Sequence, residues 1–146
     1  MTTGNLTENL KKLTALDQPE IRLALEVSAA NVVKHMQMNH RRPATTAERI
    51  GHPDPRFYTW TGKLVNSMRA GAVKVGFKVM SIEVKAGDRS TNYAADVEFG
   101  TPHSRQFPFF RPALAETAKV NMEMIGSSIR KALRRMAQEA RGPSSV

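Results

Sequence analysis

The spacing of apolar residues changes twice along this 146-residue chain, and this change constrains the fold more than any other feature. Before residue 41 and after residue 112, apolar residues recur every three or four positions, as on one face of a helix. Between residues 68 and 101 they recur at every second position, as on one face of a strand. The order predicts a single α+β domain, in which an antiparallel sheet of three to four strands packs against a long N-terminal helix and a long C-terminal helix.

Three helices are predicted, over residues 5–15, 18–40 and 112–140. Asp17 can cap the second of them, Pro112 suits the first turn of the third, and Gly142 ends it before a short tail over 142–146. The expected core face of the second helix is Ile21, Leu25, Val32 and Met36, widened by Leu23, Val27 and Val33. The expected core face of the third is Leu114, Ala118, Met122, Ile125, Ile129, Leu133 and Met136.

The sheet is expected over residues 67–101, after a proline-containing loop with short helical turns over 41–66. The alternation of apolar residues changes phase between Val79 and Met80, which predicts a turn or bulge near residues 76–80. The last predicted strand is YAADVEFGT, residues 93–101. It is expected to bury Tyr93, Ala95, Val97 and Phe99 and to turn Asp96 and Glu98 toward solvent.

Composition narrows the classes of function. The formal net charge is +9, which favours contact with nucleic acid, an anionic surface or an acidic protein. The last helix carries a candidate face for DNA or an acidic partner, although a solvated surface explains it equally well; its residues are Arg130, Lys131, Arg134 and Arg135. Cysteine is absent, which excludes disulfides and thiolate metal sites. We expect no signal peptide and no membrane span.

The sequence offers little for catalysis, so we expect no enzymatic activity and no cofactor. His35 and His40 are five residues apart and do not share a helix face as a metal pair would. Asp96 and Glu98 share a face of the predicted strand, but solvated strand residues explain them better than acid–base chemistry. An enzyme would have to use Glu98 as its carboxylate.

An aromatic cluster follows the predicted sheet. Phe107, Phe109 and Phe110 lie among prolines that keep the segment extended, so at least one ring is a candidate anchor for a neighbouring subunit. The candidate interface comprises Glu98, Arg105, Phe107, Phe109, Phe110 and Arg111.

Three motifs occur in order: TGKLVNS over residues 61–67, YAADVEFGT over 93–101 and PFFRPAL over 108–114. In this order and spacing they resemble the neck, or tail-completion, family of long-tailed bacteriophages, over about residues 20–135. The family often has Pro-x-Asp before the Thr-Gly turn, where this chain has Tyr58-Thr59-Trp60.

The resemblance implies a non-enzymatic virion protein at the head–tail junction, either a tail-completion or a terminator protein, assembled in the host cytoplasm. It implies a homo-oligomeric ring of six copies that joins the tail tube to the head connector and lets DNA pass. The implied partners are further copies of the chain, neighbouring neck and tail-tube proteins, and DNA contacted without sequence reading. The alternative is a basic nucleic-acid-binding protein without enzymatic activity.

Overall fold

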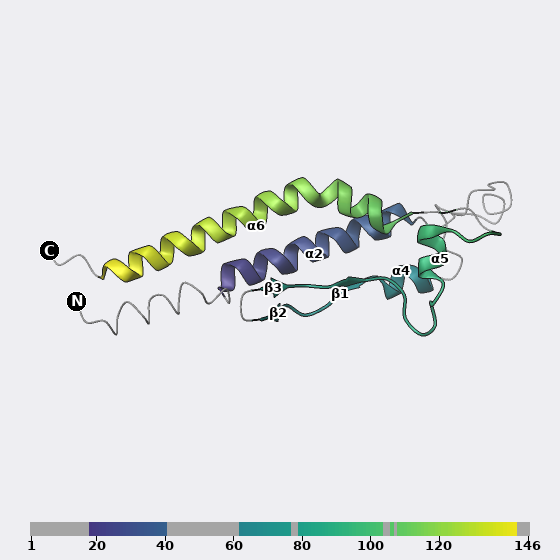
Figure 1. The fold of residues 1–146 in the computed structure, drawn as a ribbon, viewed down its shortest axis with the longest axis horizontal. Helices are drawn as coiled ribbons and strands as arrows, with labels where there is room; N and C mark the ends of the chain where they lie inside the picture. Colours follow the sequence, from purple (N-terminus) through teal and green to yellow (C-terminus); the bar gives the residue numbers. More distant parts are fainter. Residues whose placement is uncertain (1–17, 41–61, 77–78, 104–105, 107, 143–146) are drawn as a thin grey trace.

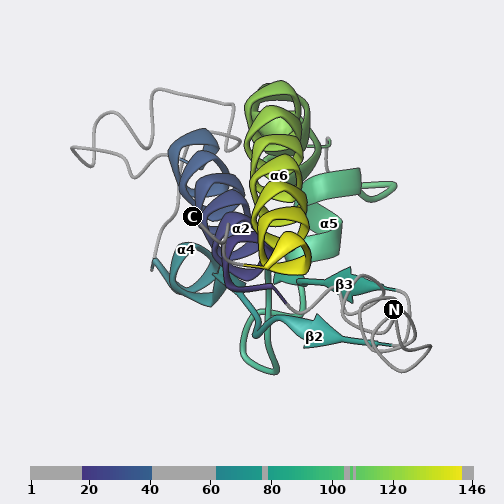
Figure 2. The same ribbon diagram turned by 90° about the vertical axis from the view of Figure 1, so that its left-hand side faces the viewer.

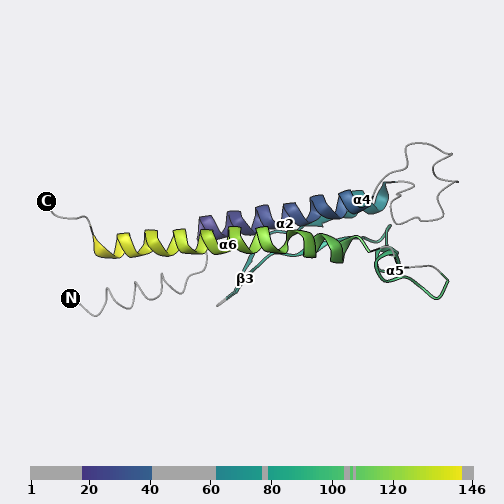
Figure 3. The ribbon, with the colours of Figure 1, turned by 90° about the horizontal axis from the view of Figure 1, so that it is seen from above.

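The computed structural model describes residues 18–40, 62–76, 79–103, 106 and 108–142. Two helices dominate it: α2, Pro19–Asn39, and α6, Phe110–Arg141. They lie side by side and run antiparallel (Figure 1, Figure 2), and α6 extends past the start of α2 (Figure 3). The mixture of helices and short antiparallel strands, with its long C-terminal helix, agrees with the predicted α+β class.

The helix ends follow local chemistry. Pro19 stands in the first turn of α2, where a missing backbone N–H costs nothing, and Gln18 occupies the N-cap position. Asp17, the predicted cap, lies outside the described residues. At the other end of the pair, Gly142 adopts φ 70°, and its backbone N–H donates to the carbonyl of Glu139. Gly142 therefore ends α6 as predicted.

The face of α6 that packs on α2 is not the predicted one. Small and polar residues fill it, namely Ala113, Thr117, Asn121 and Ala132. The facing stripe of α2 contains Ala24, Ser28 and Ala29 beside Ile21, Val32 and Met36. Side chains expected in the core are exposed instead, including Leu23 and Val27 of α2 and Leu114, Met122, Ile129 and Leu133 of α6. Small residues allow close helix packing, and this leaves the larger apolar side chains on the flanks.

A two-stranded ribbon packs against α2 on a side distinct from α6 (Figure 1). It consists of β1, Arg69–Ala70, paired with β4, Val84–Lys85, and of β2, Lys74–Val75, paired with β3, Met80–Ser81, all antiparallel. Ribbon residues 70 and 74 are four steps apart, but their partners 84 and 81 are only three apart, so β1 and β2 are separated by one extra residue. The turn predicted near residues 76–80 is confirmed, since Gly76 N–H donates to Val79 O at 2.7 Å.

The predicted strand over residues 93–101 is wrong, and so is a continuous sheet of three to four strands. Residues Ala94–Phe99 form a short helix, α5, and the four strand segments pair only two by two. The burial pattern is also partly wrong, because Glu98 is buried, whereas Tyr93, Ala95 and Phe99 are exposed. Asp96 is exposed and Val97 partly buried, as predicted. Asp96 and Glu98 therefore do not share a face, since residues two apart on a helix point in different directions.

The core lies where the C-terminal end of α2 meets the start of α6. A second short helix, α4, Lys63–Ser67, closes this end, and it begins inside the segment for which short helical turns are predicted. The buried core cluster consists of Val32, Met36, Leu64, Met68, Ala94, Phe109 and Ala113. The predicted helix over 5–15, most of the loop over 41–66 and most of the tail lie outside the described residues.

Candidate functional site

Glu98 caps α6 from a distant point in the sequence. The first backbone N–H groups of a helix have no partner within the helix, and the N-cap residue here is Phe109, which has no polar side chain. Glu98 Oε2 accepts hydrogen bonds from the N–H groups of Phe109 at 2.8 Å and Phe110 at 2.9 Å, and Oε1 accepts from Arg111 N–H at 3.0 Å. The carboxylate also lies at the positive end of the helix dipole.

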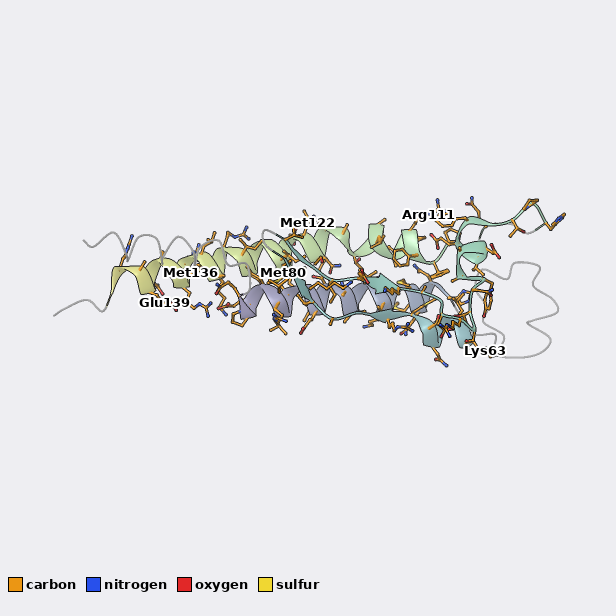
Figure 4. All side chains as sticks on the ribbon, turned by 60° about the horizontal axis from the view of Figure 1, so that its bottom comes forward. Lys63, Met80, Arg111, Met122, Met136 and Glu139 are labelled. Carbon is orange, nitrogen blue, oxygen red and sulfur yellow. The ribbon has the colours of Figure 1, made fainter. Side chains whose placement is uncertain are left out.

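The Arg111 side chain completes this arrangement. Its Nε donates to Glu98 Oε1 at 3.0 Å, and its Nη2 donates to the Glu98 carbonyl at 3.2 Å and to Gln106 Oε1 at 3.3 Å. The guanidinium carbon lies 5.1 Å from the centroid of the Phe99 ring, a cation–π distance. Arg111 therefore ties α5 to α6 through both its charge and its flat face (Figure 4 labels it at the start of α6).

The protonation state of Glu98 follows from these contacts. Burial alone would raise the pKa of this carboxyl group, but hydrogen bonds from the backbone N–H groups of Phe110, Arg111 and Phe109, and from the Arg111 side chain, together lower its pKa below the ordinary value. Glu98 is thus held as a carboxylate whose oxygens are already occupied by donors. Such a group suits the fixing of a helix start; a general acid at neutral pH would need a raised pKa.

The three sequence motifs converge on this end of the molecule. Leu64 comes from residues 61–67, Ala94 from 93–101, and Phe109 with Ala113 from 108–114, and all four belong to one core cluster. Ser67 joins the first motif to the loop before α5, because its Oγ accepts from Gly87 N–H at 2.8 Å. The motif residues are therefore packed into one structural unit.

An apolar cavity of about 400 Å³ opens beside this unit, between β4, α5 and the first turn of α6. Phe99 lies at its edge with 65% of its surface exposed. The other apolar lining residues are Val84, Ala86, Ala94, Ala95, Phe109 and Phe110. A large exposed aromatic ring beside an apolar cavity is typical of a protein contact surface.

The candidate interface residues have different environments. Arg111 has 54% of its side chain exposed and Phe110 is partly buried, so both can reach a partner. Phe109 and Glu98 are almost fully buried, at 1% and 4%, so neither offers a surface for direct contact. Their role is to build the unit that presents Arg111 and Phe99. Arg105 and Phe107 lie outside the described residues.

The predicted basic face is divided between two roles. Arg130, Lys131 and Arg134 are exposed and form no ion pair within the described residues. They line a cavity of about 470 Å³ together with Glu20, Ser127, Arg135 and Gln138. Arg135 differs, because its Nη1 lies 3.2 Å from Glu20 Oε1 and its Nη2 bonds the Gln18 side chain. Arg135 thus anchors the start of α2 to α6.

The described histidines and carboxylates do not assemble a metal site. His35 Nδ1 lies 2.9 Å from Glu116 Oε2, linking α2 to α6, and His40 packs against the Phe109 ring with centroids 5.8 Å apart. Across the part of the chain that the structure describes, no group of three or more histidine, aspartate or glutamate side chains could hold a metal ion.

Two features were missed at the sequence level. One is the exposed Phe99 with Arg111 over it, which the strand assignment had buried. The other is the polar contact between the long helices, in which Asn31 Nδ2 donates to Asn121 Oδ1 at 3.1 Å and Asn121 Nδ2 donates to Ser28 O at 3.3 Å. The recurrence of Ala113, Thr117 and Asn121 every four residues was the available signal for that buried stripe.

Comparison with known proteins identifies no relative: the chain matches no protein-family model, no curated protein and no solved structure. Among the helices in the described ranges, none has the length and apolar character needed to cross a membrane.

Proposed function

We propose that this chain is a structural subunit of the bacteriophage head–tail junction, a tail-completion or terminator protein that forms a ring between tail tube and head connector. The observation that carries the proposal is the convergence of the three motifs on one unit, in which Leu64, Ala94 and Phe109 share a core and Glu98 caps α6. The residues on which the resemblance rests thus belong to one structural unit, and Arg111 and Phe99 are exposed on its surface.

The surface supports a protein that is completed by partners. Large apolar side chains stay exposed along α6, over the ribbon and at α5, and such surfaces mark contact sites. The proposal includes six copies per ring, contacts with neighbouring neck and tail-tube proteins, and a location in the virion.

Assembly tests the proposal. Purified protein, or protein extracted from virions, should form or join rings visible by electron microscopy, and deletion of the gene should leave heads and tails separate. A protein that stays monomeric at all concentrations, together with normally joined particles after deletion, would contradict the proposal. The outcome depends on assembly alone, so it separates a connector from a basic protein that does not assemble.

A second candidate function, sequence-independent nucleic-acid binding, is favoured by the three cations on α6 that no carboxylate within the described residues neutralises. Reversing the charge at Arg134 should weaken binding to duplex DNA, and for each phosphate that the variant no longer touches, the slope of log K against log salt should become shallower by about 0.9. Reversing Arg69 on β1 is the matched control, since it changes the net charge equally away from this face. The absence of measurable DNA binding at low salt would exclude this function.

A further inference from the structure

An apolar seam runs along α6 beside the face that packs on α2. It consists of Ala118, Met122, Ile125, Ile129, Leu133 and Met136, at intervals of three or four residues. At 100° per residue these positions fall within about 80° of one another, the width of a helix–helix contact. Met122 is 72% exposed, Leu133 48% and Ile129 39% (Figure 4 labels Met122 and Met136). The seam is a ridge of flexible and branched side chains open to a second surface.

A recess of matching chemistry lies at the α5 end of the same molecule. The cavity of about 400 Å³ is lined by apolar side chains from three elements, among them Val84 of β4, Ala95 of α5 and Phe110 of α6. Ala95 is exposed at its wall and Phe99 at its edge. The cavity is large enough for one or two methionine or leucine side chains.

Free charges of opposite sign flank the two surfaces. Lys119 and Arg130 follow the solvent side of the seam, and Asp96 lies on α5 next to Ala95. All three are exposed and form no ion pair with any other described residue. Lys85 and Arg111 also line the cavity, but they are already paired with Glu83 and Glu98, so the unpaired charge beside the cavity is that of Asp96. Attraction between Asp96 and one of the seam cations would favour one orientation of the seam over the reverse.

We propose that the seam of one copy docks into the α5 cavity of a second copy, with Lys119 or Arg130 facing Asp96. The inference rests on the proposed ring function and assigns its subunit interface. A head-to-tail contact uses two different patches, so each added copy leaves one seam and one cavity free until rotation closes a ring. This chain has a ridge and a recess on different elements, as such a contact requires.

Two variants separate the two surfaces. The seam variant Met122→Glu with Leu133→Glu places charges on the ridge, and the cavity variant Ala95→Arg fills the recess with a cation. A control, Ser127→Glu with Gln138→Glu, makes the same charge change on the opposite face of α6. All substituted side chains are exposed, and circular dichroism confirms folding before assembly is measured.

Native mass spectrometry should find each interface variant monomeric and the control assembled like the wild type. Mixing the seam and cavity variants should give a one-to-one heterodimer and nothing larger, because each copy retains only one intact surface. Rings retained by either variant would overturn the docking inference while leaving the ring function standing. A cavity variant that dimerises alone would also overturn it, since that result indicates a symmetric seam-to-seam contact. If the wild type assembles only with virion components, the same variants are scored by incorporation into particles.

Discussion

Glu98 and Arg111 are thirteen residues apart in the sequence, and they meet at the start of α6, where Arg111 donates to Glu98 through both its backbone N–H and its Nε, each at 3.0 Å. The contact joins the motifs over residues 93–101 and 108–114, two of the three on which the resemblance to phage neck proteins rests. The direction of α6 therefore depends on the position of α5. The position of α5 depends in turn on the preceding loop, where Gly87 N–H donates to Ser67 Oγ. The surfaces we assign to partners are therefore positioned by a small set of buried polar contacts.

Removing the Glu98 carboxylate should destabilise the protein. Glu98→Ala leaves the N–H groups of Phe109, Phe110 and Arg111 without their acceptor, and we expect a loss of about 3 kcal/mol in the free energy of unfolding, measured by urea denaturation. Asp96→Asn, on the exposed side of the same helix, is the control and should change stability by less than about 0.5 kcal/mol. Equal effects from the two substitutions would show that the cap contributes nothing.

The contribution of Glu98 should vanish in acid. Its pKa is lowered in the folded state, so its stabilisation is fully present above the unfolded pKa of about 4.3 and is lost as pH falls through the folded pKa. Between pH 8 and 5 the stability difference between wild type and Glu98→Gln should stay constant, and below about pH 4 it should shrink. Comparing the two proteins cancels the other carboxylates with lowered pKa values, such as Glu83 at about 2. A difference that persists at the lowest pH would contradict the assignment.

The sequence predicted the extent of α6 because Pro112 and Gly142 are local signals that act within one helical turn. It failed for residues 93–101, because alternating apolar residues over so short a stretch fit either a strand or the two turns of α5. What decides between them is the contact of Glu98 with the start of α6, and no local pattern reveals a contact eleven to thirteen residues away.

The misassigned face of α6 has a different cause. Met122 and Leu133 carry the same hydrophobic signal whether they are buried within one chain or against another, so periodicity alone could not show which side faces α2. In the structure, α6 instead packs on α2 through its stripe of small and polar residues, which contains Thr117 and Asn121. The large residues left outside form the seam, to which we assign the subunit interface.

The polar contact between the long helices should couple two positions far apart in sequence. In a double-mutant cycle with Asn31→Ala and Asn121→Ala, we expect a coupling free energy of about 1 kcal/mol, since each amide loses its hydrogen-bond partner. The Asn121 substitution alone should cost more than the Asn31 substitution, because it also removes the bond to the Ser28 carbonyl. Additive effects in urea denaturation would mean that the side chains do not interact in solution.

Two glycine-to-alanine substitutions should change stability in opposite directions. Gly87 has φ 90°, and an added Cβ would lie 2.8 Å from Thr91 O and 3.0 Å from Ala94 Cβ, so Gly87→Ala should lose more than about 1 kcal/mol. Gly126 lies within α6, where the nearest side-chain atom to an added Cβ is Arg130 Nη1 at 3.5 Å. Gly126→Ala should therefore gain about 0.5–1 kcal/mol by its higher helix propensity. Thermal unfolding of the two variants measures both changes in stability. Gly87 also sets the path of the chain into α5, so Gly87→Ala should in addition weaken the proposed docking of a second copy into the α5 cavity.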